Sequence, residues 1–509
     1  MLIKIVDNQW MYFEQISIAE ENIIDNAFQV ENPKAKFIEA GSYGGTIHYY
    51  NRFKRKMPLP FYQDVIALLD KRMLPYQLAD VREDSKLPAE SLVTESLIPG
   101  VVLMQYQVDA IKSTCRHDNG LISATTGSGK TLIMAGIIKV HDCNTAILCD
   151  MGSVLDQIKK EMELKDIAEC GAFYAGKRPN GQKVIIGSIQ ALCVPSEPVK
   201  KVTDSPEKFA KQMKAWNTRR KNATTLRKLV GSCDMLLIDE ADVAGSRSWS
   251  KLFRDWFKGR KKYGLSGSFF DPDKPIDNMS LRANIGNIIY QVDRQDVQDA
   301  GRIVPIKYVM LSFGNDDRNN KCVYDEALKE IMVENVKFHN TIAKLTEKSL
   351  VRGPDDGVFI IVESVQLGQT LANTIPNSIF ISGSDSIKMR DKELRRFESR
   401  ELKVLITSRI AKRGIDLKGG IETLIIASGG KLGSAIKQSI GRGFRVNKQG
   451  YTTVYDFMFM GSHYLYNHSK KRLKTVVGAG HEDIKLVTKK GIIDKEKLVS
   501  SKFRVPSGA

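Results

Sequence analysis

The chain has 509 residues, enough for about three domains. It is 42% hydrophobic and 27% charged, a composition that is typical of soluble globular proteins and excludes a mainly disordered or collagen-like chain. Lys and Arg outnumber Asp and Glu by 77 to 59, which gives a net charge of +18. A surplus of this size indicates a polyanionic partner, most often nucleic acid.

The seven cysteines are scattered, and none belongs to a Cys-x-x-Cys pair. This pattern argues against a disulfide framework or a structural zinc site and favours a reducing compartment. No segment has the ~18 uncharged apolar residues that span a bilayer, and the first residues lack the basic and apolar regions of a secretory signal. The sequence therefore predicts a cytoplasmic protein, in the host cytoplasm if it is viral, with no membrane partner.

Residues 1–95 mix short apolar alternations with one helical pattern, residues 61–73, whose apolar positions recur at spacings of three and four. We interpret these residues as a small α+β accessory domain that binds DNA. The polar, proline-bounded segment 82–100 is typical of a linker. The cations that this domain would offer to DNA are Arg52, Lys54, Arg55 and Lys56.

Two series of apolar runs follow, the first in residues 100–305 and the second in residues 306–460. The runs are continuously apolar, which is typical of strands covered on both faces of a parallel sheet. The sequence therefore predicts two tandem doubly wound α/β lobes. The predicted strands are LISA, TAILCD, KVIIGS and CDMLLIDE in the first series, and IKYVMLSF, GVFIIVES, SIFISG, KVLITS, ETLIIAS and TTVYDF in the second.

Two strongly basic segments stand outside this pattern. Residues 198–230, an insertion in the first lobe, contain ten Lys or Arg and two Asp or Glu. Residues 461–509 contain eleven and four, and we expect them to form a basic C-terminal extension. Because these segments hold most of the net charge, the surplus is concentrated rather than spread over the surface. The role of the insertion stays open.

The segment ATTGSGKT, residues 124–131, lies between a predicted strand and a predicted helix. Its glycines allow a tight turn whose N–H groups point at a phosphate, and the helix N-terminus adds a favourable dipole. Lys130 would reach the β- and γ-phosphates of ATP, and Thr131 would bind Mg²⁺. The first position is Ala124, where the usual pattern has Gly. The predicted nucleotide-binding residues here are Thr126, Gly127, Ser128, Gly129, Lys130 and Thr131.

A second apolar strand, residues 235–238, ends in the acidic sequence Asp239-Glu240-Ala241-Asp242. Ligands bind at the carboxyl ends of parallel strands, so this position favours a functional role. We expect Asp239 to hold Mg²⁺, and Glu240 to orient and deprotonate the attacking water.

Three polar residues of the second lobe, Gln438, Arg442 and Arg445, are spaced by four and three along a predicted helix. They therefore share one helical face. Two arginines on such a face need an anionic partner, and the γ-phosphate of ATP would provide one. We predict that all three take part in catalysis.

In this order, the segments resemble the motifs of superfamily 2 helicases and translocases. The resemblance implies two RecA-like lobes with ATP between them. It implies that Gln107 reads adenine, and that Gly414 and Asp416 of the segment RGID contact the nucleotide. The residues that it assigns to nucleic-acid phosphates are Ser188, Gln190, Thr407 and Ser408.

The forms GLSGS, residues 264–268, and QSIGRGFR, residues 438–445, are more similar to phage UvsW-type branch-migration helicases than to DEAD-box RNA helicases. This resemblance implies an ATP-dependent DNA helicase or translocase, expected to be a monomer. It would act on single-stranded, forked or four-way DNA in replication, recombination or repair. The alternatives are an RNA helicase that remodels ribonucleoprotein, a binding module that uses ATP as a switch, and a restriction-enzyme motor subunit.

Overall fold

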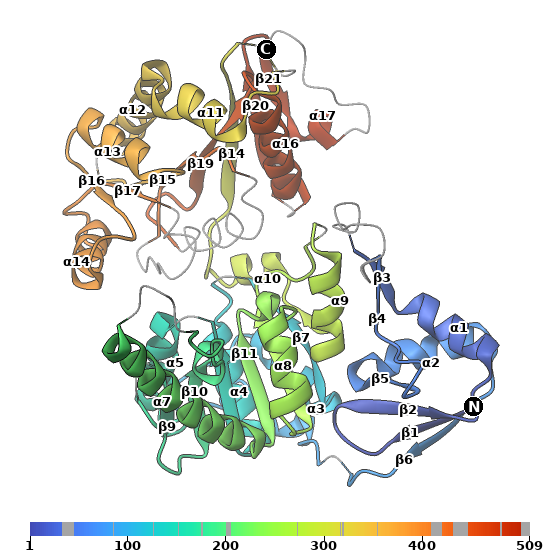
Figure 1. The fold of residues 1–509 in the computed structure, drawn as a ribbon. Coiled ribbons are helices and arrows are strands. Elements are labelled where there is room, and N and C mark those ends of the chain that lie inside the picture. Colours follow the sequence, from blue (N-terminus) through green and yellow to red (C-terminus); the bar gives the residue numbers. More distant parts are fainter. Residues whose placement is uncertain are drawn as a thin grey trace. The chain divides into compact units, whose positions relative to one another are not determined.

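The structure is a computed structural model that divides into two units, residues 1–293 and 294–509, each described by itself (Figure 1). The described residues are 1–32, 45–84, 86–125, 127–150, 152–174, 177–199, 205–271, 273–315, 317, 320–353, 355–408, 420–430, 446–478 and 481–499, without the side chains of 152–154, 387 and 499.

The first unit begins with a small α+β domain, as its sequence pattern predicted. Its sheet is mixed, because β1 pairs with β2 antiparallel and with β6 parallel. The sheet order is β5 (Lys56–Pro58), β2 (Trp10–Glu14), β1 (Leu2–Ile5) and β6 (Gln77–Asp80). The remaining elements are α1 (Ile18–Ala27), the strand pair β3 (Gln29–Glu31) and β4 (Thr46–His48), the 3₁₀ turn η2 (Leu59–Phe61) and α2 (Tyr62–Lys71).

This N-terminal domain shares its hydrophobic core with α9 (Pro275–Asn284) of the following lobe, since Met279 and Ala283 pack into it. Polar contacts fix the same interface. Gln9 Nε2 donates to the backbone oxygens of Phe253 and Phe257, at 2.8 and 2.9 Å. The domain is therefore an integral part of the first unit.

Lys262 is buried at this interface, where its Nζ donates to the backbone oxygen of Asn8 at 2.7 Å. Burial lowers the pKa of this ammonium to about 8. Between about pH 8 and the ordinary Lys value of 10.5, the unfolded chain binds more protons than the folded one, so stability rises with pH. We expect Lys262→Met to remove this rise, which is on the order of 3 kcal/mol in total, in urea unfolding measured across that range. An unchanged rise would contradict the assignment to Lys262.

The first lobe contains a seven-stranded sheet in which every pair is parallel, so its carboxyl edge is shared by all strands. The four predicted strands are present, and β9, β12 and β13 are additional. From edge to edge the strands are β13 (Ile288–Gln291), β7 (Asn119–Ser123), β12 (Lys261–Ser266), β11 (Met235–Asp239), β8 (Thr145–Cys149), β10 (Val184–Ser188) and β9 (Cys170–Phe173).

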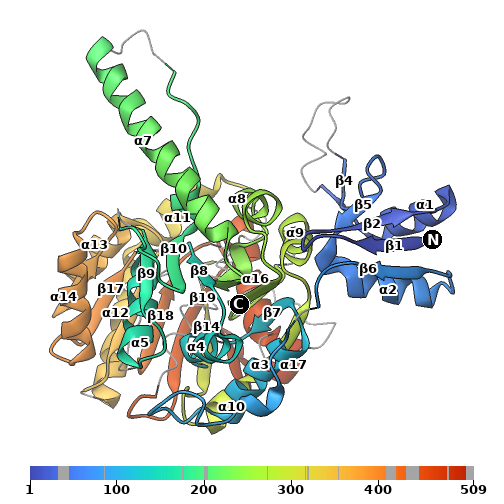
Figure 2. The same cartoon turned by 90° about the horizontal axis from the view of Figure 1, so that it is seen from below.

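Helices cover both faces of this sheet (Figure 2). One layer contains α3 (Gln105–Arg116), α4 (Lys130–His141) and α5 (Gly152–Leu164). The other contains α6 (Ile189–Leu192), α7 (Pro206–Gly231), the 3₁₀ turn η4 (Ala241–Val243), α8 (Arg247–Lys251), the π-helical turn η5 (Leu252–Trp256) and α9.

The segment expected to be a linker packs against the first lobe instead. It contains a 3₁₀ turn, η3 (Glu90–Leu92), and buries the side chains of Val93 and Ile98. Glu90 also pairs with Arg116, with 2.5 Å between the Glu90 Oε2 and Arg116 Nη2 atoms. The sequence did not predict this packing, because the few apolar residues of segment 82–100 do not recur with helical or strand periodicity.

The second lobe contains an eight-stranded sheet that includes all six predicted strands, so the prediction of two RecA-like α/β lobes is confirmed. All its strand pairs are parallel except β20 with β21. The order is β16 (Ser378–Ile381), β17 (Val404–Thr407), β15 (Val358–Val362), β18 (Thr423–Ala427), β19 (Thr452–Phe459), β14 (Ile306–Phe313), β20 (Asp483–Thr488) and β21 (Gly491–Asp494).

Helices pack on both faces of the second sheet. Residues of α11, α12, α13 and α16 share one core with it, while Phe397 of α14 packs against Phe359 on the other face, with ring centroids 5.8 Å apart. The described helices are α10 (Arg294–Asp299), α11 (Tyr324–Leu328), η6 (Lys329–Val333), α12 (Val336–Arg352), α13 (Val365–Thr374), α14 (Ile387–Glu398), α16 (His463–Gly478) and α17 (Lys495–Val499).

The second unit starts at residue 294, earlier than the boundary expected at residue 305. The difference arises because α10 contacts the second lobe. Arg294 Nη1 donates to Nε2 of His481 at 3.3 Å, a contact between residues far apart in the sequence.

The described residues of the basic C-terminal extension expected at 461–509, which are 461–478 and 481–499, are not separate from the second lobe. Its strands β20 and β21 extend the sheet beside β14, and α16 packs on β19. Arg472 of α16 is fully buried and pairs with Asp456 of β19, with 2.9 Å between Nη2 and Oδ1. Contacts with residues distant in the sequence therefore bury part of this charged segment in the second lobe.

Among the described residues, no helix has both the length and the hydropathy needed to cross a membrane.

Candidate nucleotide and nucleic-acid sites

The loop between β7 and α4 has the conformation that its glycines predicted. Gly127 and Gly129 have φ values of 90° and 79°, a region that residues with a Cβ rarely adopt. The side chain of Ser128 is buried, and its Oγ donates to the backbone oxygen of Thr125 at 2.7 Å. α4 begins directly at Lys130, so the loop leads into a helix N-terminus. Thr126 lies outside the described residues.

Gln107 lies beneath this loop and is buried. Its Nε2 donates to the backbone oxygen of Ser128 at 2.8 Å, and its Oε1 accepts from the backbone N of Met104 at 3.0 Å. A Cβ at Gly129 would come within 2.5 Å of the same Nε2. In this structure Gln107 therefore supports the loop, and its expected reading of adenine stays a prediction.

The acidic residues at the end of β11 lie next to the phosphate loop. Asp239 is the last, buried residue of the strand. Glu240 turns the chain away from the sheet with a φ of 52°. Its Oε1 lies 3.2 Å from Nζ of Lys130, and both side chains are largely shielded from solvent. The structure thus joins the loop cation to the carboxylate that was predicted to be the general base.

Ser266, at the end of β12, contacts both the phosphate loop and the acidic residues that follow β11. These contacts were not predicted from the sequence. The backbone oxygen of Ser266 accepts from the N of Ala124 at 2.8 Å. Its buried Oγ lies 3.5 Å from Glu240 Oε2 and 3.3 Å from Asp242 Oδ1. β12 lies between β7 and β11 in the sheet, which places this hydroxyl between the loop and the carboxylates. The motif GLSGS was the signal that could have found it.

The donor types expected to hold Mg²⁺ fit that ion. Thr131 offers a hydroxyl and Asp239 a carboxylate, which are hard oxygen ligands. No cluster of three or more His, Cys, Asp or Glu suited to a metal occurs in the described part of the chain. Mg²⁺ is usually bound by one or two such side chains together with substrate phosphates. The assignment of Thr131 and Asp239 stays a prediction.

Two predicted nucleic-acid contacts lie where β10 leads into α6. Ser188 caps α6, and its Oγ accepts from the N of Ala191 at 3.3 Å. Gln190 is exposed on the first turn, and its Nε2 contacts Oδ1 of Asp150. Both residues line a cavity of about 790 Å³ beside α7.

The predicted contacts of the second lobe are described only in part. Thr407 ends β17, and its Oγ1 donates to the backbone oxygen of Ser408 at 3.0 Å. Both side chains are buried, so neither is exposed to a nucleic-acid strand in this conformation. The other predicted residues of this lobe lie outside the described residues: Gly414, Asp416, Gln438, Arg442 and Arg445.

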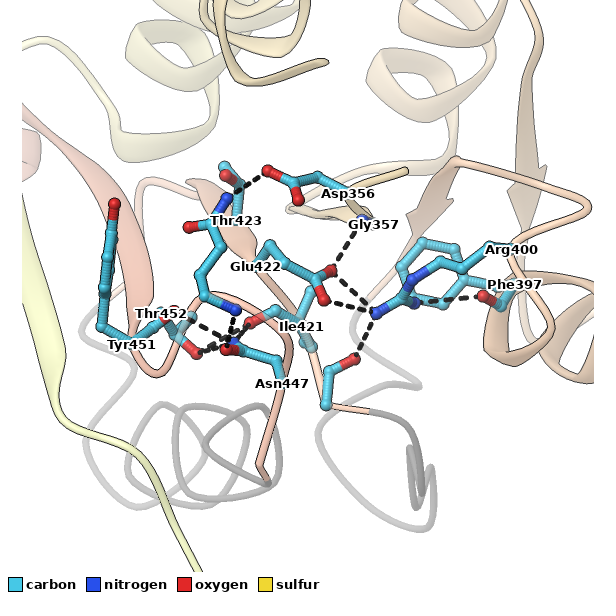
Figure 3. Close-up of polar contacts among 12 residues, drawn as sticks. Asp356, Gly357, Phe397, Arg400, Ile421, Glu422, Thr423, Asn447, Tyr451 and Thr452 are labelled. Carbon is cyan, nitrogen blue, oxygen red and sulfur yellow. Dashed lines mark hydrogen bonds and ion pairs between the residues drawn. The ribbon is translucent and has the colours of Figure 1, made fainter. Parts of the chain in front are cut away.

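A polar cluster at the start of β15 and β18 was not anticipated (Figure 3). Arg400 Nη2 lies 2.7 Å from Oε2 of the buried Glu422, which also accepts from the N of Gly357 at 2.7 Å. Asn447 Nδ2 donates to the backbone oxygen of Ile421 at 2.8 Å. The cluster ties together residues that follow the predicted motif segments at 413–416 and 438–445. Its partners are too far apart in the sequence to be recognised there.

Most cations of the basic cluster in the N-terminal domain have a partner within the domain. Arg52 and Arg55 pair with Asp25 and Glu21, at 2.6 and 2.9 Å. Lys56 Nζ lies over the Trp10 ring, 3.8 Å from its centroid. The fourth cation, Lys54, is exposed. Three of the four predicted DNA contacts therefore have structural partners here.

Comparisons with known proteins agree with the two-lobed architecture. Residues 100–270 match the family described as type III restriction enzyme, res subunit, and residues 340–447 match the helicase conserved C-terminal domain. The two matches together cover more than half of the chain. No curated protein matches the chain.

Solved structures with similar folds include bacteriophage T4 UvsW, with 16% identity and a TM-score of 0.44, where the match covers 96% of this chain and 99% of that one. The Hef helicase domain from Pyrococcus furiosus has 13% identity and a TM-score of 0.47, with 72% of this chain and 98% of that chain covered.

Proposed function

Since the chain belongs to the superfamily 2 helicases, which are ATP-hydrolysing enzymes, we propose that it is a DNA helicase or translocase that acts on branched DNA. Its role would be fork remodelling or branch migration in replication, recombination or repair. It would act as a monomer in the cytoplasm, which for a viral protein is that of the host.

The proposed chemistry follows from the contacts around Lys130. When ATP binds, the ammonium of Lys130 would leave its ion pair with Glu240 and pair with the β- and γ-phosphates instead, which are the stronger anions. Glu240, released from this pair, would accept the proton of the attacking water. Mg²⁺ at Thr131 and Asp239 would supply charge neutralisation to the phosphates.

The second lobe would contribute the remaining groups of the reaction. Arg442 and Arg445 would stabilise charge on the γ-phosphate from the other side of ATP. Binding and hydrolysis of ATP would then close and open the two lobes, so that contacts to the DNA backbone advance along a strand.

The proposal for branched DNA rests on an exposed aromatic side chain at the tip of the turn between Asn51 and Lys56. Phe53 is 97% exposed there. The backbone N of Asn51 donates to the oxygen of Lys56 at 2.8 Å, and the backbone N of Lys56 donates to the oxygen of Asn51 at 3.2 Å. The ion pairs of Arg52 and Arg55 described above brace the same turn. A rigid turn that presents a bare aromatic ring is suited to stacking on a base at the point where two strands separate.

The test compares ATP hydrolysis and strand separation in the presence of single-stranded, duplex, forked and four-way DNA and of single-stranded RNA. We expect branched DNA to stimulate hydrolysis most strongly. Stimulation by RNA alone would instead support the alternative of an RNA helicase that remodels ribonucleoprotein.

Phe53→Ala should lower the affinity for forked and four-way DNA by about tenfold, since stacking on an aromatic ring contributes ~1–3 kcal/mol per base. Hydrolysis without DNA should not change, because the turn is not part of the ATP site. Met73→Ala is the control, because Met73 is 90% exposed on the same domain and is not part of the turn. Equal affinities of both variants for branched DNA would remove Phe53 from the proposal.

A further inference from the structure

Helix α7, which forms most of the basic insertion, borders the cavity of about 790 Å³. The helix has 26 residues and projects beyond the first lobe (Figure 2). The wall of the cavity opposite α7 consists of the ends of β9 and β10 and the residues that follow these strands. We call this cavity the α7 groove.

The C-terminal half of α7 is anchored firmly to the lobe. Val230 and Ala223 are buried, and Arg227 Nε donates to the backbone oxygen of Leu192 at 2.8 Å. Arg227 also lies over the Trp256 ring, 4.3 Å from its centroid. Further out, Trp216 Nε1 donates to the backbone oxygen of Pro195 at 3.0 Å. From Trp216 to its C-terminus, α7 is therefore held against the lobe.

The residues of α7 that line the groove recur at spacings of three and four, so they share one face of the helix. This face changes character along its length. Leu226 and Leu229 form an apolar base near the lobe, whereas Lys211 and Lys214 lie toward the outer end. From position 211 to position 229 the face is about 27 Å long, at 1.5 Å per residue.

The charge of the groove has one sign. Its lining includes five cations and no carboxylate. Lys177 pairs with Asp156 at 3.1 Å, and Arg178 Nη2 donates to Oδ1 of Asn222 at 2.6 Å. Within the part of the chain that the structure describes, Lys211 and Lys214 are exposed and have no ion pair. These two ammonium groups are thus available to a polyanion.

We propose that the α7 groove holds the phosphodiester backbone of a DNA strand, which makes the insertion part of the DNA-binding surface; this inference rests on the proposed function. Lys211 and Lys214 contact phosphates, as lysines do without reading sequence. The apolar base suits sugar and base faces, which an acidic peptide would not offer. The groove is continuous with Ser188 and Gln190, so the same strand reaches the contacts predicted at the start of α6.

The double variant Lys211→Ala/Lys214→Ala tests this site by titration of a single-stranded DNA oligonucleotide at several salt concentrations. We expect the slope of log affinity against log salt to fall by about 1.4, because each lost phosphate contact removes ~0.7 on a single strand. Lys221→Ala/Lys228→Ala is the matched control. It removes the same charge from exposed positions of α7 that do not line the groove, and its slope should hardly change.

Ala215→Trp is a second test, because it fills the groove without changing its charge. We expect weaker DNA binding and a smaller salt slope, because a strand displaced from the groove no longer contacts Lys211 and Lys214. Unchanged affinity of Ala215→Trp, or equal slopes of the two double variants, would overturn the assignment to the groove. All three variants should hydrolyse ATP without DNA at the rate of the unmodified chain. If that unmodified chain itself neither binds DNA nor hydrolyses ATP faster with it, the proposed function fails, independently of α7.

Discussion

Glu240→Gln should abolish most ATP hydrolysis while ATP still binds. The amide has nearly the shape of the carboxylate, but it cannot accept a proton from water at neutral pH, and a general base contributes about 10²–10⁴ in rate. The 3.2 Å contact of Glu240 with Lys130 makes a further consequence measurable. An amide holds the ammonium less strongly than a carboxylate does, so the ATP affinity of the variant should be equal or higher.

Nucleotide binding and single-turnover hydrolysis, measured on the same preparation, check this expectation. Lys130→Ala is the comparison, because it removes the cation that faces the phosphates and should lower both affinity and hydrolysis. Ser266→Ala keeps both charged groups and removes only the hydroxyl beside Glu240, so its effect should be smaller. Loss of ATP affinity in Glu240→Gln would mean that the carboxylate holds the site together rather than acting as base.

Arg472→Leu should destabilise the second lobe by about 3–5 kcal/mol, the cost of breaking a buried ion pair by removing one partner. Asp456 would remain fully buried, with Tyr308 Oη as one remaining donor, at 2.5 Å. Arg472 also donates to the backbone oxygens of Gly430 and Phe457, at 2.9 and 2.8 Å, and these oxygens would lose a donor. Urea unfolding of the full chain measures the loss.

The control for this prediction is Lys474→Leu, an exposed position of the same helix, where a change within about 0.5 kcal/mol is expected. Replacing Arg472 and Asp456 together by apolar residues should recover much of the lost stability, because no charge is then left buried without its partner. If Arg472→Leu unfolds like the unmodified chain, residues 461–499 are a peripheral extension after all.

The strands of both lobes could be predicted because a strand covered on two faces is apolar along its whole length. This holds for β8, β11, β15 and β18, all of whose residues are buried. β20 was missed because it alternates, with Ile484 and Leu486 buried and Lys485 exposed, inside a segment whose charge dominated the pattern. β9 was missed because CGAF is short and contains glycine.

The phosphate loop and the acidic strand end could be predicted for a different reason. Their residues are adjacent in the chain, so spacing alone specifies which groups lie together. The supports of the site could not be predicted in this way. Gln107 lies 21 residues before Ser128, and Ser266 lies 26 residues after Glu240. Only the packing of α3 against the loop and the order of the strands in the sheet bring these side chains into contact.

The sequence by itself determined the two α/β lobes, the phosphate loop, the carboxylates after β11 and the large positive charge. The tertiary structure alone decided which cations are available to a partner. Arg52, Arg55 and Arg472 have carboxylate partners, whereas Lys211 and Lys214 line a groove. The physical reason is that a charge is neutralised by whatever the fold places within a few ångströms, and separation along the chain carries almost no information about that distance.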